Sequence, residues 1–291
     1  MKKLSNLSII LLTLSACARL ESIPYTPEQT PESWLQIQPF VKLKIGIFDF
    51  ILVQPSSTIL VYLLGFITIG IGIYFFLIQS SHQSRKWWGI ALVLWGLGAL
   101  FAGTSYQAFS YEIKCAGKSI CSWTSWWEII YLILSVASID AMLISGAFSS
   151  WKGKHRQVLV YLALSKFAVY CVLVIIGILT LNEFLISFEL LLIVTAPTIL
   201  FLFLLNGWRY RKYKDRLDAA LAVTWVWLGA IIGTYFLYLL LGITERLWDH
   251  GIWFSENDVL HIGLISWMLY IRIKVAKLVR DQSAPDPAKE K

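Results

Sequence analysis

The sequence contains few charged residues and few histidines. Asp, Glu, Lys and Arg together make up 15% of its 291 residues, against roughly 25% in an ordinary soluble domain. No two of the four histidines are four positions apart, as the paired histidines of a helical zinc site would be. The sequence also has no Gly-rich phosphate loop, no Gly-x-Ser-x-Gly and no Cys-x-x-Cys. These absences argue against motif-bearing ATPases, zinc proteases of the His-Glu-x-x-His type and α/β-hydrolases.

Long apolar runs dominate the chain. Hydrophobic residues make up 57% of it, and the 14 Trp and 13 Tyr provide amphipathic rings suited to membrane–water interfaces. A helix needs about 20 apolar residues to cross the hydrocarbon core. Seven runs are long enough: 58–79, 87–109, 126–148, 157–181, 184–206, 217–242 and 259–279. The sequence therefore predicts an all-α membrane protein, with a bundle of seven transmembrane helices over residues 58–280.

Basic residues are distributed unevenly between the two sets of loops. Three fall on one side, at Lys114, Lys118 and Arg246. Fourteen fall on the other side: Arg85, Lys86, Lys152, Lys154, Arg156, Arg209, Arg211, Lys212, Lys214, Arg216, Arg272, Lys274, Lys277 and Arg280. Because basic loops stay in the cytoplasm, this predicts an N-terminus outside and a cytoplasmic C-terminus. It also explains the formal net charge of +7 without a nucleic-acid partner.

The N-terminus resembles a bacterial lipoprotein signal. Lys2 and Lys3 precede a short apolar stretch, which ends in Leu-Ser-Ala-Cys at residues 14–17. This pattern predicts a signal segment over residues 1–17, cleavage that leaves an acylated Cys17, and insertion in the bacterial inner (cytoplasmic) membrane. The alternative is an ordinary or uncleaved signal in which Cys17 is incidental.

Residues 18–57 read as a periplasmic or interfacial segment. Pro24, Pro27 and Pro31 indicate an extended linker. Apolar and other residues alternate over 41–47, which is typical of a short strand, although a segment lying on the membrane surface fits equally well. At the other end of the chain, residues 281–291 read as a cytoplasmic tail.

Two cysteines share one predicted outer loop. Cys115 and Cys121 lie six positions apart, with Gly117 between them. If the loop is exported, its compartment is oxidising, and the pair can close a disulfide.

Asp140 and Lys166 fall inside predicted membrane spans. Each lies eight or nine residues from the inner end of its helix, or roughly 12–14 Å at ~1.5 Å per residue. The two helices are joined by a short loop, so we expect them to be neighbours with a buried ion pair between these side chains. A proton or ion pathway is the alternative, because ionisable residues in the membrane often have a function.

A second polar group falls near the outer ends of three helices. Gln107, Glu128 and His261 each lie within a turn or two of that boundary, with Glu112 just above them and Glu189 somewhat deeper. A histidine beside carboxylates can run acid–base chemistry or bind a metal. We expect one outward-facing pocket; the alternative is that Gln107 and Glu128 are interfacial caps and His261 is a hydrogen-bonded residue at a helix start.

Seven helices, an outside N-terminus and Asn257-Asp258-Val259-Leu260-His261 at the start of the last helix together resemble the alkaline ceramidase and adiponectin-receptor superfamily. There, one His from the second helix and two from the seventh hold a zinc ion, and a Ser and an Asp assist amide hydrolysis. The resemblance places residues 105–110 at the second-helix motif, Glu128 near the acidic position and His261 at the first seventh-helix histidine. Ile265 stands where the next histidine would be, and Gln107 or Ser110 replaces the other. The resemblance therefore implies a relative that has lost the metal or reassigned the site, without a cofactor.

These observations predict a polytopic protein that binds a lipid or small ligand in its outward pocket, or serves as a subunit of a membrane complex. Its expected partners are membrane lipids and other membrane-protein subunits. The rival interpretation is a membrane-embedded, ceramidase-like hydrolase that uses Glu128 and His261 with Glu112 or Ser105. Separately, Gly229 and Gly233 form a small-xxx-small pattern that predicts close helix packing.

Overall fold

A computed structural model describes residues 19–282 of the chain. Ahead of the first long helix lie the short helix α2 (Pro31–Gln36) and the strands β1 (Phe40–Ile45) and β2 (Phe48–Val53). The predicted signal segment and Cys17 lie outside the described residues.

The two strands form an antiparallel hairpin. Phe40 pairs with Val53 at its base and Ile45 with Phe48 at its turn. Gly46 lies in that turn with a φ of +63°, a conformation that glycine adopts without a steric penalty. The alternation over residues 41–47 therefore marks a strand, as one of the two interpretations predicted.

Long helices make up the rest of the described chain, with short helices between them. In order they are α3 (Pro55–Leu77), α4 (Gln83–Ala102), the π-helix η1 (Gly103–Ala108), α5 (Ser110–Lys114), α6 (Trp126–Ser150), α7 (Gly153–Thr180), the 3-10 helix η2 (Glu183–Ile186), α8 (Phe188–Tyr213), α9 (Arg216–Leu240), α10 (Ile243–Asp249), α11 (Glu256–Tyr270) and the π-helix η3 (Ile271–Val275).

Within residues 19–282, six helices are long and apolar enough to cross a membrane: α3, α4 together with η1, α6, α7, α8 and α9. The chain is thus an all-α, multi-pass membrane protein with one small hairpin. The seventh predicted span, 259–279, coincides with α11 and η3. It has charged residues near both ends, Glu256 and Asp258 in α11 and Arg272 and Lys274 in η3, which shorten its apolar stretch, and it is not among the six.

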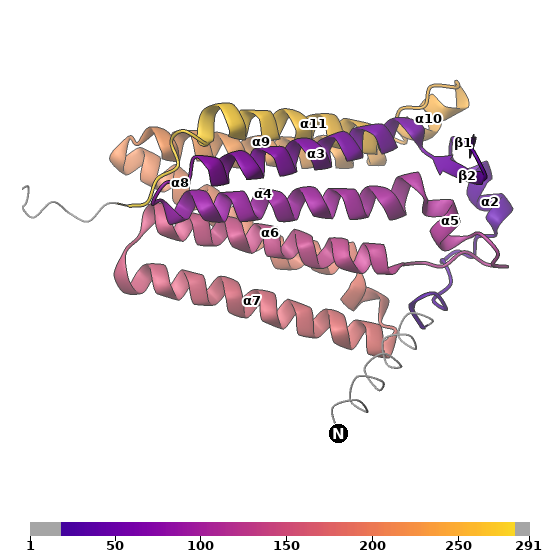
Figure 1. Cartoon of the computed structure of the whole chain (residues 1–291), viewed down its shortest axis with the longest axis horizontal. Coiled ribbons are helices and arrows are strands. Elements are labelled where there is room, and N and C mark those ends of the chain that lie inside the picture. The colour runs from indigo at the N-terminus through magenta and orange to yellow at the C-terminus, as the bar shows by residue number, and fades with distance from the viewer. Residues whose placement is uncertain (1–18, 283–291) are drawn as a thin grey trace, which may run out of the picture.

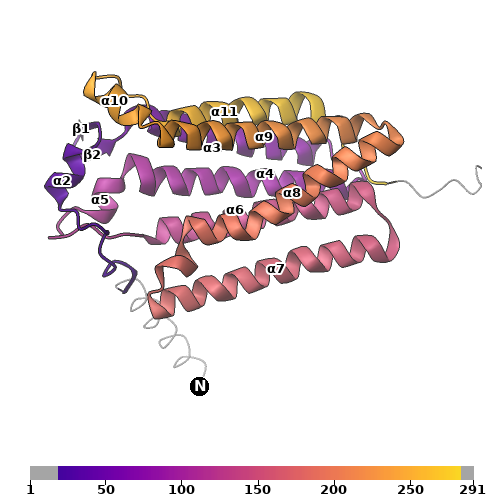
Figure 2. The same ribbon diagram turned by 180° about the vertical axis from the view of Figure 1, so that it is seen from behind.

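Five of these six helices form a closed ring together with α11. Each contacts the next in the order α3, α4, α6, α8, α9 and α11, and α11 returns to α3. Helix α7 lies outside this ring against α6 (Figure 1). Figure 2 shows α8 crossing the bundle obliquely, from the side of α7 toward α9.

The small elements gather at one end of the bundle. The hairpin, α2, α5 and α10 lie together there, whereas the described chain ends at the other side (Figure 1). We call these the hairpin end and the opposite end. The first residue of the predicted tail is bonded to the bundle. The Asp281 carboxylate accepts hydrogen bonds from the backbone N–H of Gln83 and Ser84 at 2.9 and 2.7 Å.

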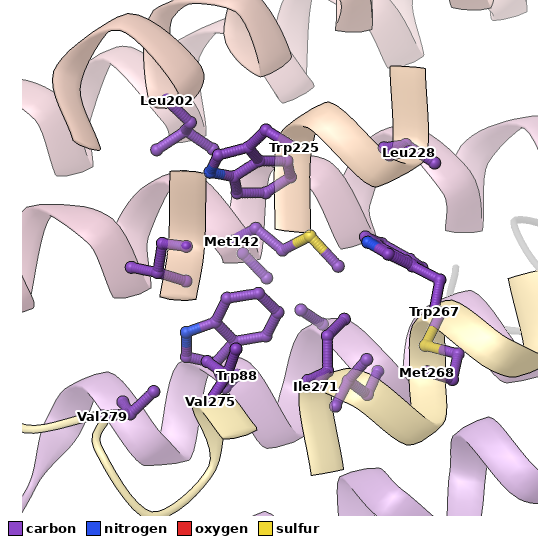
Figure 3. Packing of buried hydrophobic residues seen from close by; sticks show 14 of the residues in the cluster. Trp88, Met142, Leu202, Trp225, Leu228, Trp267, Met268, Ile271, Val275 and Val279 are labelled. Atoms are coloured by element: carbon purple, nitrogen blue, oxygen red, sulfur yellow. The ribbon is translucent and has the colours of Figure 1, made fainter. Parts of the chain in front are cut away.

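Tryptophans fill the core inside the ring. Trp88, Trp225 and Trp267 are at most 4% exposed, and Figure 3 shows Met142 among their rings. A buried indole N–H needs an acceptor. That of Trp225 donates to Asn206 Oδ1 at 3.0 Å, and that of Trp267 to the backbone oxygen of Thr224 at 2.8 Å.

Glycines bring α3 and α4 into close contact. A Cβ added to Gly96 would lie 2.7 Å from the backbone oxygen of Gly65, and one on Gly72 would lie 2.9 Å from that of Gly89. Such distances leave no room for a side chain. The predicted packing role of Gly229 and Gly233 is wrong: both are exposed on α9 and have nothing within 4 Å of an added Cβ.

Candidate functional site

A buried ion pair joins Lys114 and Glu128 at the hairpin end. Lys114 ends α5 and Glu128 lies in the first turn of α6. Lys114 Nζ lies 2.5 Å from Glu128 Oε1, and each side chain is only 3% exposed. The hydroxyls of Ser105 and Thr124 also donate to this carboxylate, at 2.7 and 3.1 Å. The Glu128 charge is therefore offset, and both of its oxygens accept hydrogen bonds.

Sequence reasoning missed Lys114 as a site residue because it counted this lysine only as a loop charge. The structure joins the next residue, Cys115, to Cys121 by a disulfide, as predicted. The backbone N–H of Ser122 also donates to the Lys114 carbonyl at 2.9 Å. The sequence did contain one indication: Lys114 directly precedes the predicted Cys115–Cys121 disulfide, which restricts the position of its backbone.

A polar cavity of about 290 Å³ surrounds the Lys114–Glu128 pair. Its wall is rich in aromatic and amide side chains: Tyr25, Trp34, Gln38, Gln54, Tyr106, Lys114, Trp123, Glu128, Ile186, Ser187, Phe188 and Glu189. Lys114 Nζ lies 5.0 Å from the centre of the Tyr106 ring, within cation–π range. Burial raises the pKa of the Tyr25 phenol above its ordinary value, and the negative charge of Glu128 raises it further.

Three groups on this wall are available to a ligand. Glu189, one of the predicted pocket residues, is exposed and carries a carboxylate. Among residues 19–282, the buried Nε1 of Trp34 and Oε1 of Gln54 have no hydrogen-bond partner. Because Lys114 and Glu128 offset each other, Glu189 leaves the cavity with one net negative charge.

A second, apolar cavity of about 200 Å³ lies deeper in the bundle. Its few polar side chains are Tyr131, Ser135, Thr195 and His261; the remaining lining is Val61, Leu64, Trp95, Ala99, Ala102, Ile139, Phe188, Leu191, Leu192, Ile199, Leu228, Ile232, Leu260 and Leu264. His261 is 6% exposed, and its Nδ1 has no hydrogen-bond partner among the described residues. A buried polar atom without a partner is costly, so a ligand group that bonds it would bind favourably.

Phe188, the first residue of α8, lines both cavities. Tyr106 of the polar cavity and Tyr131 of the apolar cavity also meet edge to face, with ring centroids 6.0 Å apart. The two cavities are therefore neighbours with aromatic rings between them.

The residues of the predicted pocket are divided between the two cavities: Glu128 lines the polar cavity, His261 lines the apolar cavity, and Gln107 lines neither. The cause is local: the chain around Gln107 is π-helical, which changes the direction of successive side chains. Gln107 is 6% exposed. Glu112, also predicted to line the pocket, instead accepts a hydrogen bond from the Ile51 N–H at 3.0 Å and ties the hairpin to α5.

The start of α11 has its own hydrogen-bonded cluster. Asp258 is fully buried and accepts from the N–H and hydroxyl of Ser255 at 2.6 and 2.9 Å. The Ser255 hydroxyl also lies 3.0 Å from that of Ser57 on α3. The spacing of Ser255 and Asp258 is that of a capping box. His261, one turn later, is thereby fixed toward the apolar cavity.

The predicted ion pair between α6 and α7 is confirmed. Lys166 Nζ lies 2.7 Å from Asp140 Oδ1, with Asp140 5% and Lys166 22% exposed. Lys166 also donates to the hydroxyl of Thr198 on α8 at 2.6 Å. One lysine thus connects α7, the helix outside the ring, to both α6 and α8.

Residues 19–282 contain no group of three or more His, Cys, Asp or Glu side chains that could hold a metal ion.

A family model matches residues 57–279, from the start of α3 to the segment after η3. The chain belongs to this family, DUF6962, a family of unknown function. No curated protein and no solved structure matches the chain. The matched region includes Lys114, Glu128, Phe188 and His261. It does not include Trp34 of α2 or Gln38 between α2 and β1, both of which line the polar cavity.

Proposed function

We propose that this protein binds an amphipathic lipid or a similar small amphiphile, with the polar end of the ligand in the polar cavity and its apolar part in the apolar cavity. The observation that carries the proposal is Phe188, which lines both cavities. An amphiphile needs adjacent polar and apolar compartments of this kind.

The polar cavity favours a headgroup that is cationic or rich in hydroxyls. Glu189 and Gln54 offer acceptors, the Trp34 indole offers a donor, and the net charge of the wall is negative. Aromatic faces attract cations and stack on sugar-like rings. An anionic headgroup would be repelled by Glu189 and would find Lys114 already occupied by Glu128.

The membrane placement that accompanies this proposal is the one that the sequence predicts. α11 with η3 forms a seventh span, the hairpin end faces outward, and the opposite end faces the cytoplasm of a bacterium. The fourteen-to-three distribution of basic residues supports this orientation. The disulfide at the hairpin end supports it too, because disulfides persist in oxidising compartments. Acylation of Cys17 would anchor the same end.

Lipid retention by purified protein tests the proposal. We would purify the full chain in mild detergent and identify retained lipids by native mass spectrometry, together with Ala99→Phe, which fills the apolar cavity. The matched control is Val226→Phe, because Val226 is 57% exposed on α9 and lines neither cavity. We expect Ala99→Phe to lose a lipid that the wild type and the control retain.

Other outcomes decide between this function and its rivals. Equal retention by both variants, or no lipid on the wild type, would contradict the proposal. Stoichiometric zinc would instead favour a ceramidase-like hydrolase, and co-purified protein subunits would favour a role within a membrane complex.

A further inference from the structure

Four cationic side chains surround a hollow of about 440 Å³ at the opposite end of the bundle, with a lining that shares no residue with the two cavities. They are Arg85, Arg216, Lys277 and Arg280, and His82 and Asp215 complete the polar lining. We call this the basic hollow. We propose that it binds a phosphate-bearing anion, either the headgroup of an anionic phospholipid or a free phosphate compound.

Three distant parts of the chain meet there: the start of α4, the start of α9 and the segment after η3. Hydrogen bonds fix the last segment in place. Asp281 bonds the first N–H groups of α4, Arg85 Nε and Nη1 donate to the backbone oxygens of Val279 and Ile78 at 2.7 Å each, and the N–H of Gln282 donates to the Phe148 oxygen at 3.0 Å. The backbone around the hollow is therefore held in place without a ligand.

The cations retain many free donors. A guanidinium has five N–H groups and an ammonium has three. Arg85 uses two in its backbone contacts, and Arg280 uses one on Asp215, at 3.0 Å. Among the described residues, the side chains of Arg216 and Lys277 make no hydrogen bond or ion pair. These unused donors outnumber the acceptors on the wall, so an anion with several oxygens would find partners.

The charge balance agrees with this assignment. Asp215 is the one carboxylate on the wall, and it already bonds Arg280 and the N–H of Leu217. Asp281 lies nearby but is occupied by the start of α4. Even with both carboxylates counted, the four cations leave a net charge of about +2. Basic pockets between transmembrane helices bind phosphorylated headgroups by this mechanism.

The test uses Arg216→Gln/Lys277→Gln in the full chain, because neither side chain makes a hydrogen bond or ion pair with the described residues. Lys154→Gln/Arg211→Gln is the matched control: it removes the same charge at the same end, at positions that do not line the hollow.

The protein would be placed in nanodiscs of neutral phosphatidylcholine. In one arm, inorganic phosphate or pyrophosphate is titrated at constant ionic strength. In the other, part of the lipid is replaced by phosphatidylglycerol. Thermal stability is followed by tryptophan fluorescence, and native mass spectrometry counts bound anions and lipids.

We expect saturable stabilisation in one arm, with an apparent affinity about 30-fold weaker in Arg216→Gln/Lys277→Gln and unchanged in the control. Response to phosphate identifies a soluble ligand, and response to phosphatidylglycerol alone identifies a lipid headgroup. No response in either arm, or equal weakening in the two double variants, would overturn the proposal. The second result would mean that overall charge, and not this hollow, attracts the anion.

Discussion

Lys114 Nζ and Glu128 Oε1 lie 2.5 Å apart, and both side chains are 3% exposed. Removing one partner of a buried pair strands the other charge, which costs about 3–5 kcal/mol. We therefore expect Lys114→Met to lower the free energy of unfolding by about this amount, and Lys114→Met/Glu128→Gln to recover part of it. Unfolding in detergent, followed by tryptophan fluorescence, measures both.

Lys118 provides the control for this prediction. It pairs with Glu21 at 3.2 Å, but the two side chains are 25% and 53% exposed. Partly exposed pairs contribute at most about 1 kcal/mol, and Lys118 also donates a hydrogen bond to Ser122 Oγ at 2.9 Å, so Lys118→Met should cost less than Lys114→Met. Similar losses for Lys114→Met and Lys118→Met would show that the buried pair does not support the fold.

A second prediction concerns the α3–α4 contact. An added Cβ on Gly96 would lie 2.7 Å from the Gly65 oxygen, so Gly96→Ala must separate the helices. Overpacking of this kind costs about 1–3 kcal/mol. Gly229→Ala is the control, because nothing lies within 4 Å of its added Cβ. We expect thermal unfolding to show a loss for Gly96→Ala and none for Gly229→Ala; the reverse order would contradict the packing.

Much of the fold could be predicted from composition and apolar run length. Membrane spans can be recognised in the sequence because an apolar run of about 20 residues is rarely found outside them. The glycine contacts could not be predicted from the sequence, because Gly65 and Gly96 lie on different helices and their approach depends on how the helices cross. Gly229 and Gly233 have the expected spacing within one helix, yet they face outward. The spacing of residues in the sequence shows which side chains share one face of a helix. It does not show which other element, if any, packs against that face.

The candidate site shows the same division. Asp140 and Lys166 were predictable because each is a lone charge at matched depth on consecutive helices. The separation of Gln107 from His261 could not be predicted, because the π-helical turn of η1 alters the direction of the Gln107 side chain. Trp34 and Gln54 reach the polar cavity through α2 and the hairpin. No periodicity within a transmembrane helix could indicate these long-range contacts.

A third prediction concerns membrane topology. Fourteen basic residues fall on one side of the predicted spans and three on the other. We expect reporter fusions after Arg85, Lys154 and Lys214 to be cytoplasmic and a fusion after Gly117 to be exported. Alkaline phosphatase and fluorescent-protein fusions at each site would measure this in complementary ways. A cytoplasmic reporter at Gly117 would refute the orientation and, with it, an outward-facing polar cavity.

The last prediction concerns Asp140 and Lys166, whose charged atoms lie 2.7 Å apart within the membrane-spanning region. Asp140→Asn removes the negative charge but leaves Lys166 its hydrogen bond to Thr198 at 2.6 Å. Lys166→Met removes the only side chain that bonds or pairs with Asp140 among the described residues. It also removes the two hydrogen bonds that Lys166 donates to α8, at Thr198 and at the Val194 oxygen. We therefore expect both changes to lower stability, and Lys166→Met to lower it more.

The double variant separates an ion pair from two independent effects. In a double-mutant cycle, residues in contact show an interaction energy of about 0.5–3 kcal/mol, and distant residues show none. Asp140→Asn/Lys166→Met should recover part of the loss, because it removes both charges from a dry environment. Thr198→Val completes the design: it deletes the hydrogen bond from Lys166 to Thr198 and retains the ion pair and the longer bond from Lys166 Nζ to the Val194 oxygen at 3.3 Å. If the losses of Asp140→Asn and Lys166→Met simply add, the pair does not couple α6 to α7. In that case the attachment of α7 comes from its contacts with α6 and η2 and from the hydrogen bonds of Lys166 to α8.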